Sequence, residues 1–218
     1  MSANKNLLKQ TLIYGIATVL PRVISFLLVG LHTDLMPKVA YGEITILLAY
    51  MIFFNVILSY GMETAFFRFY HKQENKKEVV STATVSIFWS TILFLCLTLL
   101  FQKTLAGLLN VDKEYVNYAI WILAFDALVI IPFSKLRAEQ RPIKYSVFKI
   151  SNVIINMLLN VFLLAILPKL AHANPLGFWS TFYFEDYQIG YVFLSNLIAS
   201  LFTFVLFMPH YFQPNWLF

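Results

Sequence analysis

The sequence predicts an all-α integral membrane protein with six transmembrane helices, and two observations support this fold class. Of the 218 residues, 60% are apolar and 12% are charged, whereas soluble domains have about 45–50% apolar and about 25% charged residues. The apolar residues also form six stretches, each near the length of about 20 residues that crosses a bilayer as a helix. A domain of this size cannot bury so much apolar surface in its own core, so we expect lipid to cover it.

The six helices are bounded by polar or turn-forming segments. We expect the helices at about residues 8–31, 40–62, 79–101, 115–136, 147–167 and 188–208. The breaks between them are His32–Val39, Arg68–Glu78, Gln102–Glu114, Arg137–Tyr145 and Pro168–Tyr187. The first stretch contains Arg22 and lacks a small-residue cleavage site, so we interpret it as a retained helix and not a signal peptide.

Positive charge is distributed unequally between the two sets of loops. If the N-terminus is cytoplasmic, eleven lysines and arginines lie inside, four lie outside, and Arg22 lies within a helix. The inner residues are Lys5, Lys9, Arg68, Lys72, Lys76, Lys77, Lys135, Arg137, Arg141, Lys144 and Lys149. Because cytoplasmic loops are enriched in lysine and arginine, we expect both termini in the cytoplasm. Loops facing anionic lipid account for the net charge of +5, so nucleic-acid binding is not expected.

The first helix carries a charge deep in its apolar stretch, at Arg22. Thr18 and Ser25 lie one turn away on nearly the same face, and Pro21 should kink the helix beside it. A charged group at mid-bilayer costs about 2.5–3.5 kcal/mol on insertion scales, so it is a functional candidate by default. Either Arg22 lines a water-filled cavity and receives an anion such as phosphate, or it pairs with Asp126 to hold two helices together.

Asp126 is the second intramembrane charge and falls near the middle of the fourth helix. It has three possible roles: partner of Arg22, proton or cation site, or both. The sequence leaves these alternatives open because it cannot place two side chains on different helices within reach of each other.

Polar side chains recur every three or four residues on three further helices and so share one face of each. The stripes are Asn55, Ser59 and Glu63 on the second helix, Asn152, Asn156 and Asn160 on the fifth, and Asn196, Ser200 and Thr203 on the sixth. A single such residue usually forms a hydrogen bond between helices. Several stripes on separate helices instead favour a shared hydrated cavity.

Three arginines cluster near the cytoplasmic ends of the predicted helices. Arg68 follows the second helix, and Arg137 and Arg141 follow the fourth. They either ring a cytoplasmic mouth that collects a diphosphate head group, or they only reflect the positive-inside rule.

Two further features concern the outer side and the absence of catalytic motifs. The loop Pro168–Tyr187 is rich in aromatic residues, which form either an interfacial belt or a platform for sugars. No Walker loop, nucleophile elbow or zinc motif occurs in the sequence. The single cysteine, Cys96, cannot form an internal disulfide. We therefore expect no enzyme, no cofactor and no metal site.

Several segments together resemble a known transporter family. They are Tyr14-Gly15 through Pro21-Arg22, Phe26-Leu27-Leu28, Tyr41-Gly42-Glu43, Gly61 through Tyr70, and Asp126 through Ile131-Pro132-Phe133, Leu136-Arg137-Ala138 and Arg141-Pro142. In these segments the chain resembles the polysaccharide flippases of the multidrug/oligosaccharidyl-lipid/polysaccharide exporter superfamily. The likeness is to members of the O-antigen and lipopolysaccharide type.

This resemblance implies two pseudo-symmetric helical lobes around a central cavity that opens alternately to each side. It implies that the substrate is undecaprenyl diphosphate-linked oligosaccharide, flipped to the periplasmic leaflet of the bacterial inner membrane. It also implies that cationic residues engage the diphosphate, a role carried to Arg22 by motif position. The residues we expect to line the substrate cavity are Arg22, Arg68, Asp126, Arg137, Arg141, Asn152, Asn156 and Asn160.

Members of this superfamily have about twice as many helices, in line with the repeats of transporters. Residues 1–218 therefore correspond to the N-terminal lobe, and we expect a second lobe, absent from this sequence, as partner. One lobe alone should not transport. Two other functions stay open, namely a cation-coupled exporter of drugs or small solutes in the same superfamily, and a membrane assembly subunit that transports nothing.

Overall fold

The computed structural model describes residues 2–211, and over that range the chain forms helices and no strand. Six spans in the described range are long and apolar enough to cross a membrane, as predicted. They are Thr11–Leu35, Lys38–Lys72, Lys76–Leu100, Lys113–Ala138, Pro142–Ala173 and Gln188–Pro209. The chain is therefore a multi-pass membrane protein.

The described residues form twelve helical segments. In chain order these are α1 (Ser2–Leu35), α2 (Lys38–Ser59), α3 (Met62–Lys72), α4 (Lys76–Leu100), α5 (Gln102–Leu109), α6 (Lys113–Leu128), α7 (Ile130–Ala138), α8 (Pro142–Val161), η1 (Phe162–Ile166), α9 (Leu167–Ala173), η2 (Phe178–Phe182) and α10 (Gln188–Tyr211). Of these segments, α5 and η2 lie outside the spans.

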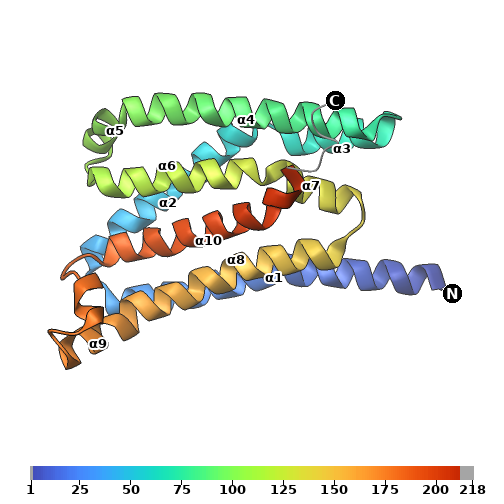
Figure 1. The fold of residues 1–218 in the computed structure, drawn as a ribbon. Helices are drawn as coiled ribbons and strands as arrows, with labels where there is room; N and C mark the ends of the chain where they lie inside the picture. The colour runs from blue at the N-terminus through green and yellow to red at the C-terminus, as the bar shows by residue number, and fades with distance from the viewer. Residues whose placement is uncertain (1, 212–218) are drawn as a thin grey trace.

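The long helices run side by side in an elongated bundle (Figure 1). We call the end that carries the α3–α4 and α7–α8 turns the basic end. Its lysines and arginines are Arg68, Lys72, Lys76, Lys77, Lys135, Arg137, Arg141 and Lys144. The opposite end, with α5, α9 and η2, we call the aromatic end. The side chains of Lys5 and Lys9 lie outside the part of the chain whose side chains are described.

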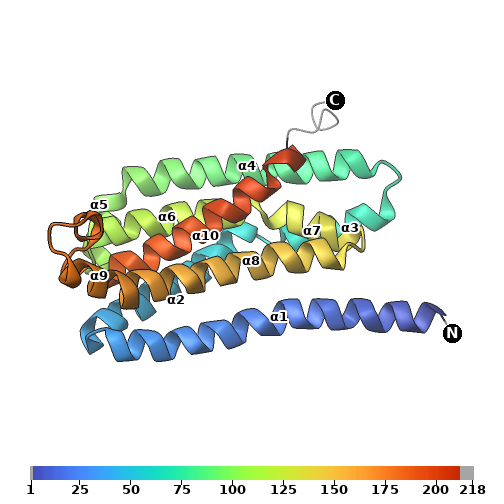
Figure 2. The same ribbon diagram turned by 60° about the horizontal axis from the view of Figure 1, so that its bottom comes forward.

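The centre of the bundle is α6, which packs against α2, α4 and α10. The largest apolar cluster joins these helices, and Leu47, Ile122 and Phe193 are almost fully buried within it. By contrast, α1 lies at the edge and packs mainly on α8, as the turned view shows (Figure 2). It continues as a helix through Pro21.

The second span contains a break that the sequence analysis did not predict. Tyr60 and Gly61 both adopt the left-handed conformation, with φ of 30° and 72°. Such residues end α-helices, and glycine adopts the conformation without a steric penalty. The span is therefore two helices, α2 and α3, and the Tyr60 hydroxyl lies 2.8 Å from Ser86 Oγ on α4. Both helices pack on α4, but α3 also packs on α7 whereas α2 packs on α6 and α10.

Several other predicted boundaries differ from the structure. The first helix continues to Leu35, and the fifth begins at Pro142 and not at residue 147. A short helix, α5, occupies most of the predicted loop Gln102–Glu114. The fifth span also continues past residue 167 to Ala173, through a π-helical segment and then α9. Pro168 does not end the span, because the backbone before it stays right-handed helical and a π-helical turn directly precedes it.

Two tyrosines, Tyr187 in the loop and Tyr191 on α10, fasten the aromatic loop to the bundle. Tyr187 donates a hydrogen bond to Glu114 on α6, and its hydroxyl lies 3.0 Å from that of Tyr118. Burial and the bond to Glu114 raise the pKa of Tyr187, so the phenol stays protonated and donates at neutral pH. Tyr191 donates to the Phe182 carbonyl at 2.8 Å. Phe178 remains 70% exposed, which both an interfacial belt and a sugar platform allow.

Replacing Gly190 by alanine should destabilise the aromatic end. A Cβ at this position would lie 2.2 Å from the ring of Tyr187, so the ring must move and its bond to Glu114 is lost. Overpacking of this kind costs about 1–3 kcal/mol, and each kcal/mol lowers the melting temperature by about 2–4 °C in a chain of this size. Tryptophan fluorescence during heating in detergent measures the change.

Gly42→Ala is the matched control, because a Cβ at Gly42 meets nothing within 4 Å. It should melt no lower than the wild type. Equal melting temperatures for Gly190→Ala and Gly42→Ala would contradict the packing described for Tyr187.

Candidate functional site

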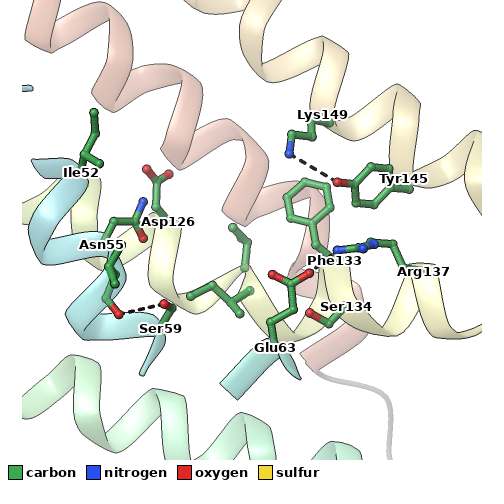
Figure 3. A pocket seen from close by; sticks show the side chains of 13 residues that line it. Ile52, Asn55, Ser59, Glu63, Asp126, Phe133, Ser134, Arg137, Tyr145 and Lys149 are labelled. Carbon is green, nitrogen blue, oxygen red and sulfur yellow. Dashed lines mark hydrogen bonds and ion pairs between the residues drawn. The ribbon is translucent and has the colours of Figure 1, made fainter. Parts of the chain in front are cut away.

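A polar hollow of about 480 Å³ lies toward the basic end, between α2, α3, α6, α7 and α8 (Figure 3). Its lining residues are Ile52, Asn55, Val56, Ser59, Glu63, Asp126, Val129, Ile130, Phe133, Ser134, Arg137, Tyr145 and Lys149. They come from three separate membrane spans. The hollow is therefore formed by the packing of segments that are distant in the sequence, and a single sequence motif does not produce it.

The polar stripe predicted on the second helix lines this hollow along its length. Asn55 and Ser59 project from α2, and Glu63 follows in the first turn of α3. The carboxylate of Glu63 suits that position because the N-terminal end of a helix carries partial positive charge. This stripe therefore lines a polar hollow, and a hydrated cavity shared by all three predicted stripes stays a prediction.

Asp126 lines the same hollow from α6. Its carboxylate accepts a hydrogen bond of 2.8 Å from the Ser200 hydroxyl on α10. Arg22 lies elsewhere. At about 100° per residue it is about 140° around α1 from Ala17, which is fully buried against the bundle, and its own side chain is exposed. Among the described residues the two charges form no ion pair with each other, which contradicts the pairing alternative.

Two cations line the hollow from α7 and α8. The Arg137 guanidinium contacts the Glu63 carboxylate and lies 5.1 Å from the centre of the Phe67 ring. Lys149 Nζ donates to the Tyr145 hydroxyl at 3.3 Å. Figure 3 shows both cations at the same side of the hollow, with Asp126 and Asn55 farther in. Guanidinium and ammonium groups can bind an anion, and here they share the hollow with the carboxylates of Glu63 and Asp126.

The other predicted arginines lie outside the hollow. Arg22 and Arg68 are exposed, on α1 and α3. Arg141 is exposed too, and its Nε lies 3.0 Å from a carboxylate oxygen of Glu139. Among the predicted arginines, Arg137 is the one that the structure places in the hollow. Substrate contact by the other three stays a prediction.

The asparagines of the fifth helix also lie outside the hollow and join helices to one another. Asn152 donates to Thr203 on α10 at 2.9 Å. Asn160 contacts the buried His32 ring on α1 at 2.9 Å and donates to Asn156 at 2.8 Å. Polar groups buried among apolar helices need such partners. The stripe thus forms interhelical hydrogen bonds, and a role in substrate contact stays a prediction.

Sequence analysis missed two residues of the site. Tyr145 and Lys149 are four positions apart on α8 and line the hollow together. Their spacing carried this signal, but Lys149 was interpreted as an inner positive charge one turn before the asparagine stripe, and Tyr145 was not singled out. Glu63 was recognised as part of a stripe, yet nothing in the sequence indicated its contact with Arg137, which is 74 positions away.

Comparison with known proteins gives one match. The sequence model of a family described as "Polysaccharide biosynthesis protein" matches residues 7–139. This range is more than half of the chain and runs from α1 to the end of α7, so it includes Arg22, Glu63, Asp126 and Arg137. No curated protein and no solved structure matches the chain.

Water should reach the hollow but not the outer face of α4. In a Cys96→Ser background, Ser59→Cys places a thiol in the hollow, and Leu93→Cys places one on an apolar face that is 61% exposed. Because the thiolate is the reactive form and apolar surroundings disfavour it, a charged thiosulfonate reagent should modify Ser59→Cys faster by about tenfold or more. Equal rates in membrane vesicles would show that the hollow is dry.

Proposed function

The chain belongs to the polysaccharide biosynthesis protein family, and on that basis we propose that it is a membrane transporter for polysaccharide synthesis. Its substrate is an undecaprenyl diphosphate-linked oligosaccharide, which it flips from the cytoplasmic to the periplasmic leaflet of the bacterial inner membrane. The observation that carries this proposal is the hollow that places Arg137 and Lys149 together within the membrane-spanning bundle.

The chemistry of the hollow suits a diphosphate that carries a sugar. The planar fork of Arg137 matches two phosphate oxygens at once, and Lys149 adds a point charge. Phe67 and Tyr145 hold these two cations in place. Deeper in the hollow, Asn55 and neighbouring polar groups can hydrogen-bond sugar hydroxyls.

The position of the hollow suits loading from the cytoplasm. It lies toward the basic end of the bundle, and the positive-inside rule assigns that end to the cytoplasm. We accordingly propose that both termini are cytoplasmic and that substrate enters from this side. The anionic head groups of the inner leaflet lie next to the same end.

Arg22 has a separate place in this proposal. It lies on the face of α1 that does not pack against α8, about 140° from Ala17, and it is exposed. We place it at the surface that a second lobe covers, where it adds a cation to the central cavity. Arg68 and Arg141 lie near the basic end and serve the initial capture of the diphosphate.

One observation favours a second candidate, a cation-coupled exporter of the same superfamily. Asp126 lines the hollow, yet among the described residues its hydrogen-bond partner is the neutral Ser200 and no cation pairs with it. A carboxylate without a cationic partner can take up a proton or a metal cation. In that case a lipophilic cation, and not a diphosphate, would bind in the hollow.

Binding of the lipid-linked substrate should depend on the two cations of the hollow. In lipid nanodiscs, a polyprenyl diphosphate oligosaccharide should bind more tightly than the uncharged polyprenol. Arg137→Gln or Lys149→Gln should weaken this binding about tenfold or more, as expected for loss of a charged hydrogen bond. Lys144→Gln, on an exposed residue at the same end that does not line the hollow, is the matched control.

Equal affinity for the diphosphate lipid and the polyprenol would contradict the proposed substrate. Binding of a lipophilic cation that is lost in Asp126→Asn would favour the exporter instead.

In cells that depend on this gene, Arg22→Ala should lower the amount of surface polysaccharide about tenfold or more. The reason is that α1 then presents no cation to the diphosphate at mid-membrane. The amount of protein in the membrane should stay normal. Phe26→Ala, which alters an exposed residue one turn along α1, is the control for changes to this face. Unchanged surface polysaccharide in Arg22→Ala cells would remove the role assigned to Arg22.

A further inference from the structure

The guanidinium best placed to bind a diphosphate already has an anionic partner. Glu63, in the first turn of α3, contacts Arg137 on α7 and joins the two helices across one side of the hollow (Figure 3). Both side chains line the hollow and are about half exposed, at 48% and 43%. A ligand entering the hollow therefore meets this ion pair and not a free arginine.

The charges that line the hollow are balanced. Arg137 and Lys149 are the cations, and Glu63 and Asp126 are the carboxylates. With all four ionised, the lining carries no net charge, so the hollow as a whole does not attract an anion. An anionic head group gains a net attraction only when a carboxylate leaves its cation, and Glu63 is the one in direct contact with a cation.

The structure lets Glu63 leave while Arg137 stays in place. The guanidinium lies 5.1 Å from the centre of the Phe67 ring, one turn after Glu63 on the same helix. This contact with the face of the ring does not involve the carboxylate and is favourable by itself. Because the pair is half exposed, water screens it, and exposed ion pairs contribute little to stability. Exchange of one anion for another at Arg137 therefore costs little.

We infer that Glu63 is an internal competitor for the Arg137 guanidinium, so that only an anion with stronger contacts than a carboxylate, such as a diphosphate, binds in the hollow. This inference rests on the proposed function. A diphosphate carries more negative charge than one carboxylate and can contact Arg137 with one phosphate and Lys149 with the other. A single phosphate brings fewer acceptor oxygens and less charge, so it displaces Glu63 less readily.

Removing the charge of Glu63 tests this inference. In nanodiscs of uncharged lipid, inorganic pyrophosphate and inorganic phosphate are the probes, and equilibrium dialysis measures their binding. Glu63→Gln should bind pyrophosphate about tenfold more tightly than the wild type, as expected when a charged competitor is lost. Its affinity for phosphate should rise by a similar factor, because both anions displace the same carboxylate from Arg137.

Two further variants separate competition from other effects. Glu74→Gln removes the same charge from an exposed residue in the α3–α4 turn, outside the hollow, and should bind both probes like the wild type. The double variant Glu63→Gln with Arg137→Gln should not show the increased affinity for pyrophosphate, because the Arg137 guanidinium that Glu63 had occupied is no longer present. Melting temperatures report whether each variant is folded.

The outcomes distinguish this inference from the function on which it rests. Suppose that Glu63→Gln binds pyrophosphate no more tightly than the wild type, while Arg137→Gln alone still weakens binding. Glu63 is then not a competitor for Arg137, but the anion site remains. An equal gain in Glu74→Gln also overturns the inference, because the effect is then one of net charge. If neither the wild type nor Glu63→Gln binds pyrophosphate, the inference and the anion-binding basis of the proposed function are both overturned.

Discussion

Lipid offers no hydrogen bonds, so polar groups within a membrane-spanning bundle must be paired inside it or lie in a hydrated space. This constraint divides the polar residues of the chain into two groups. Asn152, Asn160 and His32 find partners on neighbouring helices and hold α1, α8 and α10 together. Asn55, Asp126 and Lys149 instead line a hollow. The same requirement therefore builds the frame of the bundle and leaves a polar space within it.

The sequence was sufficient for all six spans, because an apolar stretch of about 20 residues is a strong local signal. It was not sufficient for breaks within them. The apolar run does end near Gly61, where the second helix was predicted to end, but only the structure shows that a new helix, α3, begins at Met62 after the left-handed Tyr60 and Gly61. Pro168 misled in a different way, since the π-helical turn before it lets the helix continue past a proline. Both errors arise where composition and backbone geometry disagree.

For the candidate site, the sequence identified Asp126, Arg137 and the stripe on the second helix, which all line the hollow. Periodicity shows which residues share a face, but not which neighbour that face meets. The stripe at Asn152 and Asn160 therefore had the same appearance as the one at Asn55, although it packs against other helices. Contacts between spans, such as Glu63 with Arg137, depend on packing over long separations and leave no trace in local spacing.

The peripheral position of α1 has a consequence for biosynthesis. Its main neighbour is α8, and the bond between His32 and Asn160 joins positions 128 residues apart. During translation, α1 leaves the ribosome long before α8 exists. It must therefore enter the bilayer with Arg22 and His32 still without their final surroundings, and wait there while four further spans insert. The apolar residues around Arg22 thus do more than face lipid in the finished protein, since they keep the first helix in the membrane until its partner arrives.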